Sequence, residues 1–69
     1  MKTETFNRRF FISGPDDLRA KRDEAMDAIR QTADMIYGNG NTYMISSCES
    51  WDGEWEAELE CVLVVKDSE

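Results

Sequence analysis

The fold is decided by a stretch in which acidic and apolar residues alternate strictly: Glu54-Trp55-Glu56-Ala57-Glu58-Leu59-Glu60-Cys61. This alternation runs directly into a short apolar run, Val62-Leu63-Val64-Val65. A period of two residues is typical of a β-strand that has one face in a core and the other in solvent. The sequence therefore predicts a strand whose odd-numbered residues, from Trp55 to Val65, point into the core.

The even-numbered positions of this strand predict a row of carboxylates on its other face. Glu54, Glu56, Glu58 and Glu60 would stand about 7 Å apart, because side chains on one face of a strand recur every second residue. Glutamate is a poor strand residue, and neighbouring like charges on a sheet repel. One interpretation is that the row keeps the sheet hydrated and discourages association through its edges. The other is that a partner binds the negative charge.

Composition indicates a single small domain that spans residues 1–69. The chain is 41% hydrophobic and has a net charge of −7. Residues 1–48 contain seven acids and seven bases, so residues 49–69 hold eight of the 15 acids and one of the eight bases. An acidic protein is repelled by nucleic acid and by anionic membranes. We therefore expect a basic protein partner and no direct contact with nucleic acid or membrane.

The sequence predicts a soluble, cytoplasmic protein. It contains no apolar run of the ~20 residues that span a membrane, and its N-terminus lacks the apolar region of a signal peptide. Its two cysteines, Cys48 and Cys61, are expected on opposite faces of a sheet, where a disulfide cannot join them. Both are therefore predicted to be free thiols.

An aromatic segment and a long amphipathic segment precede the acidic stretch. The segment from Thr5 to Ser13 is rich in β-prone residues and ends at Gly14, which predicts the first strand. A helix is predicted from Pro15 to about Tyr37, because proline suits the first helical position and the acids that follow it complement the helix dipole. Its buried stripe is expected to contain Leu18, Ala25, Met26, Ile29, Ala33, Ile36 and Tyr37.

The second strand, Thr42 to Ser50, is expected to form a hairpin with the acidic strand, and two registers are open. A two-residue turn at Asp52-Gly53 would give one set of core residues: Met44, Ser46, Cys48 and Ser50. A three-residue turn that begins at Trp51 would pair Ser50 with Glu54 and give another set: Tyr43, Ile45 and Ser47. We favour the second register, because tyrosine and isoleucine are better core residues than serine and cysteine. It leaves the first set beside the glutamate row.

The predicted order is therefore strand, helix, strand, strand. With a right-handed crossover and the third strand between the first two, this order gives an α+β fold. Its antiparallel sheet has three strands in the order 1-3-2, and the one long helix packs on one face. The acidic strand is then central, and Asn7 and Arg9 of the first strand would flank its glutamates.

The residues expected to contact a partner are the acids of the hairpin and the tryptophan at its predicted tip: Glu49, Trp51, Asp52, Glu54, Glu56, Glu58 and Glu60. The glutamate spacing is close to twice the axial rise per phosphate on one DNA strand, which is about 3.4 Å. Such a row suits a basic groove built for a nucleic-acid backbone. An aromatic anchor ringed by charge is typical of protein interfaces. The pattern therefore predicts nucleic-acid mimicry.

Other kinds of site lack support in the sequence. A flat row of carboxylates does not converge on a metal ion, and the chain contains no histidine, so we expect no metal. Neither cysteine has a histidine to activate it, and one sheet with one helix predicts no cleft. We therefore expect neither enzymatic activity nor a cofactor.

The charge pattern and the length resemble those of small phage-encoded inhibitors, anti-CRISPR proteins and other DNA mimics among them. The resemblance implies a partner with a basic nucleic-acid-binding surface, such as a subunit of a CRISPR effector, in the cytoplasm of the host cell. It points to the glutamates of the acidic stretch, with Glu49 and Asp52, as contact residues. The chain itself is expected to be a monomer or a homodimer.

The order of elements is also similar to that of dodecin, a small flavin-storing protein that assembles into a hollow dodecamer. This second resemblance implies an alternative function: a small homo-oligomer with flavin or another aromatic ligand, or a structural domain that associates with itself. That family stacks flavin on a tryptophan near the start of the second strand. This sequence has Thr42-Tyr43 there, and Trp51 and Trp55 stand at the far end.

Overall fold

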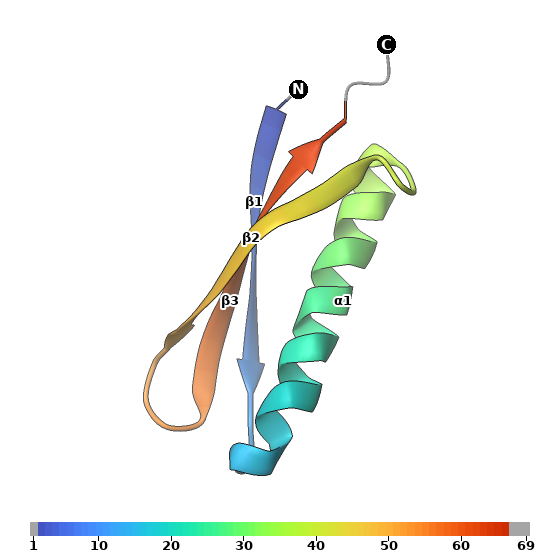
Figure 1. The fold of residues 1–69 in the computed structure, drawn as a ribbon. Coiled ribbons are helices and arrows are strands. Elements are labelled where there is room, and N and C mark those ends of the chain that lie inside the picture. The colour runs from blue at the N-terminus through green and yellow to red at the C-terminus, as the bar shows by residue number, and fades with distance from the viewer. Residues whose placement is uncertain (1, 67–69) are drawn as a thin grey trace.

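A computed structural model describes residues 2–66 and contains three strands and one long helix (Figure 1). In chain order the elements are β1 (Lys2–Phe11), the 3-10 turn η1 (Pro15–Asp17), α1 (Leu18–Tyr37), β2 (Thr42–Trp51) and β3 (Glu56–Val65). Both strand pairs are antiparallel, and the order in the sheet is β1-β3-β2. The predicted α+β fold, with its 1-3-2 order and one helix on one face, is confirmed.

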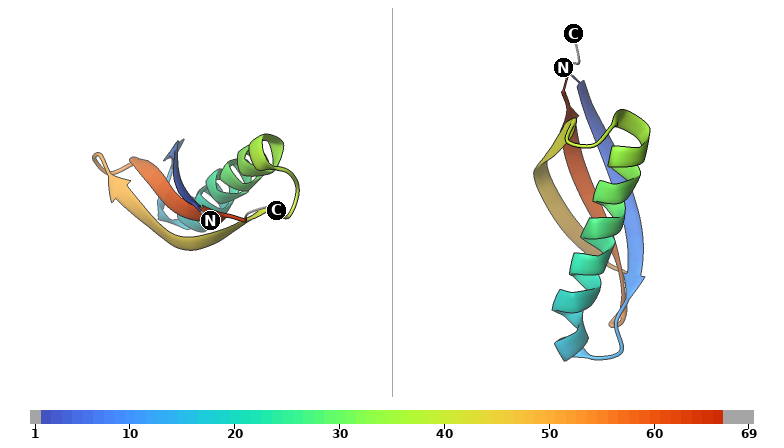
Figure 2. Two further views of the ribbon diagram at one scale, coloured as in Figure 1. Left: turned by 90° about the horizontal axis from the view of Figure 1, so that it is seen from above. Right: turned by 90° about the vertical axis from the view of Figure 1, so that its right-hand side faces the viewer.

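The sheet is strongly twisted and coils around one side of α1 (Figure 2). The helix packs mainly on β1 and β3, and only a small part of it touches β2. The radius of gyration is 13.2 Å, whereas a compact chain of this length would have about 11 Å. The fold is therefore elongated, and much of β2 has no cover from the helix.

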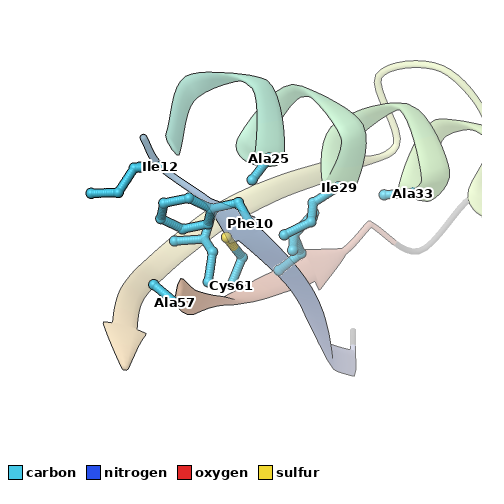
Figure 3. Close-up of a cluster of buried hydrophobic side chains, with 9 residues drawn as sticks. Phe10, Ile12, Ala25, Ile29, Ala33, Ala57 and Cys61 are labelled. Atoms are coloured by element: carbon cyan, nitrogen blue, oxygen red, sulfur yellow. The ribbon is translucent and has the colours of Figure 1, made fainter. Parts of the chain in front are cut away.

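The core lies between α1 and the odd-numbered residues of β3 (Figure 3). Leu59, Cys61 and Leu63 are at most 1% exposed, and Ala57 is fully buried. They pack with residues of the first strand and the helix: Phe10, Ile12, Ala25, Ile29 and Ala33. The predicted alternation is confirmed from position 57 to position 63. Trp55 is 46% exposed instead of buried, because it belongs to the turn before β3.

The helix begins and ends close to its predicted limits. Pro15 opens η1, and the N–H and Oγ of Ser13 donate hydrogen bonds of 3.1 and 2.8 Å to Asp17 Oδ2, which anchors the start of α1. Gly38 ends the helix with φ 98°, a left-handed value that favours glycine. The prediction that Ile36 is buried is wrong. It is 58% exposed.

The β2–β3 hairpin adopts a register that neither expected turn gives. Ser50 lies opposite Glu58, and not opposite Glu54 as predicted. The N–H of Asp52 donates a 2.8 Å hydrogen bond to the carbonyl of Glu56, so the connection is longer than three residues. A β-bulge at Ile45 then reverses the facing of the residues that precede it.

The bulge explains which hairpin side chains were assigned to the wrong face. Tyr43 and Ile45, which were expected in the core, are 46% and 53% exposed. Met44, which was expected beside the glutamates, packs against the core. For the residues after the bulge, the favoured register assigned each side chain to the correct face of the sheet. Residues Ser46, Cys48 and Ser50 all lie opposite residues of the outer face of β3, as expected.

The two cysteines lie on opposite faces of the sheet, as predicted. Cys61 is buried in the core, whereas Cys48 is exposed on the other side, and both are free thiols. Burial raises the pKa of the Cys61 thiol, which therefore stays protonated and unreactive at neutral pH. Within residues 2–66, no helix is long and apolar enough to cross a membrane.

Candidate functional site

The outer face of β3, on the side away from α1, carries the side chains of Glu56, Glu58 and Glu60. The connection that leads into β3 adds Asp52 and Glu54, which are both exposed. We call these five residues the acidic face. The neighbouring strands place uncharged or basic residues beside it: Asn7 and Arg9 from β1, and Cys48 and Ser50 from β2.

Arg9 is the one cation that contacts the acidic face among the described residues. Its Nη1 donates a hydrogen bond to Glu56 Oε2 and lies 3.7 Å from Asp52 Oδ2. The hydrogen bond to Glu56, with the charges of Glu56, Glu58 and Asp52, raises the pKa of the Arg9 guanidinium. The five carboxylates and this one cation leave a local charge of −5 + 1 = −4. Arg9 therefore offsets part of the charge of Asp52, Glu56 and Glu58 and leaves the face negative.

The other end of the row is open. In the part of the chain that the structure describes, neither Glu58 nor Glu60 forms a salt bridge. The thiol of Cys48 lies 3.8 Å from Glu60 Oε1, a distance that allows only a weak hydrogen bond. Glu58, which is half-buried opposite Arg9, and Glu60, which is exposed, are therefore two carboxylates of the central strand without a salt bridge in the described part of the chain.

Apolar residues border the acidic row at both ends. Phe11 lies opposite Glu56 and is 61% exposed. Beyond Glu60 the row gives way to Val62 and to Val64, which is buried between Thr3 of β1 and Tyr43 of β2. The outer face thus combines a charged centre with apolar flanks.

Glu49 does not belong to the acidic face, contrary to the prediction. It lies opposite Leu59, on the helix side of the sheet, and its Oε1 accepts a 3.3 Å hydrogen bond from Arg22 Nη1 of α1. Its Oε2 is buried and has no hydrogen-bond partner. Glu49 therefore ties β2 to the helix, and no spacing in the sequence marks the contact with Arg22.

Trp51 also lies elsewhere than predicted. It is the last residue of β2, not the tip of the hairpin, and it shares the helix side with Glu49. Its ring meets Phe10 edge-on, with centroids 6.1 Å apart and an interplanar angle of 76°, and the residue is 41% exposed. The structure therefore brings together five of the seven residues predicted to contact a partner and separates Glu49 and Trp51 from them.

Two open hollows flank the helix. One, of about 290 Å³, lies between β1 and the first half of α1 and is lined by side chains such as Arg8, Phe10 and Lys21. The other, of about 380 Å³, lies between β2 and the second half of α1 and includes Tyr43 and Met44. Within residues 2–66, no group of histidine, cysteine or carboxylate side chains is arranged to hold a metal ion.

No family model, curated protein or solved structure matches this chain. We therefore infer a function from the acidic face and from the elements that position it.

Proposed function

We propose that this protein is a non-catalytic inhibitor that presents its acidic face to a basic, nucleic-acid-binding surface of a partner protein. The observation that supports the proposal most strongly is the open pair Glu58 and Glu60. Both project from the central strand, and neither is in a salt bridge within the described residues. They are therefore free to accept hydrogen bonds from arginine or lysine side chains of a partner.

The cost of the arrangement favours binding over simple hydration. Like charges at neighbouring positions on one face of a strand oppose folding, and two charges about 7 Å apart in water repel by about 0.6 kcal/mol before salt screening. A mixture of acidic and basic residues would hydrate the same face without that repulsion. Arg9 compensates part of this repulsion at Asp52, Glu56 and Glu58. The remaining repulsion is relieved when a basic surface covers the row.

The partner is best described by the surface that would recognise the row. Side chains on one face of β3 recur about every 7 Å, close to two steps of the phosphate backbone, so basic residues spaced for phosphates can meet successive carboxylates. The combination of a small acidic chain and an unpaired carboxylate row resembles phage-encoded anti-CRISPR proteins. We propose as partner the DNA-binding surface of a CRISPR effector, for which the chain would compete with DNA.

The first test measures CRISPR immunity against phage in living bacteria. Strains that each carry one type of CRISPR effector and a matching spacer would be challenged with phage, with and without the chain. The proposal predicts that plaque formation recovers in at least one strain. A chain that leaves every effector type active would contradict the anti-CRISPR assignment.

A matched pair of variants then separates the row from the total charge. Glu58→Gln with Glu60→Gln removes two charges from the acidic face and should abolish recovery of plaques. Asp23→Asn with Asp27→Asn makes the same change in net charge on exposed positions of α1 and should preserve recovery. If both variants lost activity equally, net charge and not the row would be responsible. A large flavin-coloured assembly of the purified chain would instead favour the dodecin-like alternative.

A further inference from the structure

The two open edges of the sheet differ in their side chains. The edge formed by β1 carries four charged residues: Lys2, Glu4, Arg8 and Arg9. Charged side chains on an edge strand discourage pairing with another chain. The edge formed by β2 has one charged residue, Glu49, and its carboxylate is engaged by Arg22. No lysine, arginine or proline interrupts β2. Of the two edges, β2 is therefore the one suited to accept a further strand.

Exposed apolar side chains lie along the same edge. Ile45 is 53% exposed and Trp51 is 41% exposed, at the two ends of the segment that follows the bulge. By its position in the register, Trp51 is on the helix side of the sheet, where α1 leaves β2 largely uncovered (Figure 1).

We propose that a second copy of this chain pairs with β2 in antiparallel orientation, so that two three-stranded sheets become one continuous sheet. The two-fold axis would pass beside Cys48. Both helices would lie on one face of the joined sheet, and both acidic faces would lie on the other. The inference rests on the β2 edge alone and does not depend on the proposed inhibitor function.

The register follows from the geometry of an antiparallel ladder. The backbone N–H and C=O groups alternate in direction along a strand, and residues directly opposite each other must have the same direction. Two identical strands can therefore pair only with the axis beside a residue, not between two residues. An axis beside Glu49 would set two carboxylates opposite each other, which is unfavourable. An axis beside Ser47 would set Glu49 opposite the apolar Ile45.

An axis beside Cys48 avoids both conflicts. It places Trp51 opposite Ile45 of the second copy, so that the two exposed apolar residues cover each other, twice in the dimer. It also places Glu49 opposite Ser47, while Ser50 meets Ser46. The chemistry of the edge is therefore self-complementary in this register, which is the requirement for a two-fold interface.

Disulfide cross-linking through Cys48 can detect this pairing directly. Residues directly opposite in an antiparallel pair have Cα atoms about 4.5–5.5 Å apart, within the range of about 4.4–6.8 Å that a disulfide spans. Cys48 is exposed, whereas Cys61 is buried and cannot take part. Treatment with diamide, which accepts the two thiol hydrogens as the S–S bond forms, should therefore link two copies through Cys48.

The first experiment is light scattering in reducing buffer, followed by diamide treatment. The expected mass is twice the 8.0 kDa of the chain, and the oxidised sample should migrate as a covalent dimer that Cys48→Ser abolishes. In the register control, Cys48→Ser is combined with Ser50→Cys. The two thiols are then offset by four residues, or about 13 Å, and no link should form. A monomer in solution, or equally efficient linking at both positions, would overturn the proposal.

A second pair of variants tests the apolar contact. Ile45→Lys places a charge opposite Trp51 of the second copy and should convert the dimer to a monomer with an unchanged circular dichroism spectrum. Met35→Lys changes an apolar side chain of α1 that is 86% exposed and should leave the dimer intact. A dimer that survives Ile45→Lys would show that another surface is responsible.

Discussion

The two faces of β3 are built from alternate residues of one strand, yet they act on the fold in opposite directions. On the helix side, Leu59 and Leu63 are 1% exposed and supply much of the apolar burial that stabilises the domain. On the outer side, Glu58 and Glu60 hold like charges; Arg9 lies opposite Glu58, but within the described residues neither carboxylate forms a salt bridge. One strand therefore stabilises the fold with one face and carries a row of like charges on the other.

The largest expected effect comes from breaking the helix side. Leu59→Ala leaves a cavity in the core and should lower the free energy of unfolding by about 2–5 kcal/mol, measured by urea denaturation. A domain of this size has little stability to lose, so the variant is expected to be largely unfolded at 37 °C. Glu58→Ala, at the adjacent position, is the control and should change the value by less than about 1 kcal/mol. Equal losses at the two positions would contradict the division between the faces.

The next effect has the opposite sign. Glu58→Gln with Glu60→Gln removes the repulsion between these carboxylates and should raise the free energy of unfolding by at most about 0.6 kcal/mol, because charges about 7 Å apart in water interact weakly and Glu58 also loses its attraction to Arg9. The gain should shrink in high salt, because salt screens exposed charges in the parent protein. A clear loss of stability in urea denaturation would mean that the two carboxylates support the fold.

The sequence predicted the division between these faces because alternation is a local signal. The alternating stretch that ends at Cys61 predicted which side chains of the central strand are buried. The long amphipathic helix was predicted to be the element that covers them. The register of the hairpin was not predictable in the same way. A single extra residue at Ile45 reverses the facing of Met44 and Tyr43, and no residue type there marks a bulge.

The candidate site was predicted in part for the same reason. Glu56, Glu58 and Glu60 belong to the periodic strand, and their common face followed from its period. Glu49 was misplaced, because its contact with Arg22 depends on how the helix lies across the sheet. Ile36 shows the same limit, since it belongs to the predicted apolar stripe of the helix and is nevertheless exposed in its last turn.

The reaction rates of the two thiols, which lie on opposite faces of the sheet, compare these faces in the unmodified protein. Cys48 should react rapidly with a disulfide reagent in the native protein, whereas burial raises the pKa of Cys61 and shields it. One thiol per chain should react with the reagent under native conditions, and two should react in denaturant. Two fast thiols in the native state would contradict the burial of the helix side.

The smallest expected effect concerns the anchor of the helix that covers the core. The two hydrogen bonds from Ser13 lower the pKa of Asp17. A carboxyl group with a lowered pKa stabilises the fold above its unfolded pKa, and this contribution is lost as the pH falls through the folded pKa. Asp17→Asn should therefore reduce stability slightly at neutral pH. It should also make stability fall less steeply as the pH drops below the ordinary pKa of an aspartate. Thermal denaturation at a series of acidic pH values checks the slope, and an unchanged slope would argue against this anchor.

The most direct test of the central claim is competition between this chain and DNA for a purified effector that it inhibits in cells. The apparent affinity of the effector for DNA would be measured at increasing chain concentration, in low and in physiological salt. We expect DNA binding to weaken as the chain is added, the effect to be stronger in low salt, and Glu58→Gln with Glu60→Gln to remove it. A ternary complex of effector, DNA and chain, or full competition by that double variant, would contradict it.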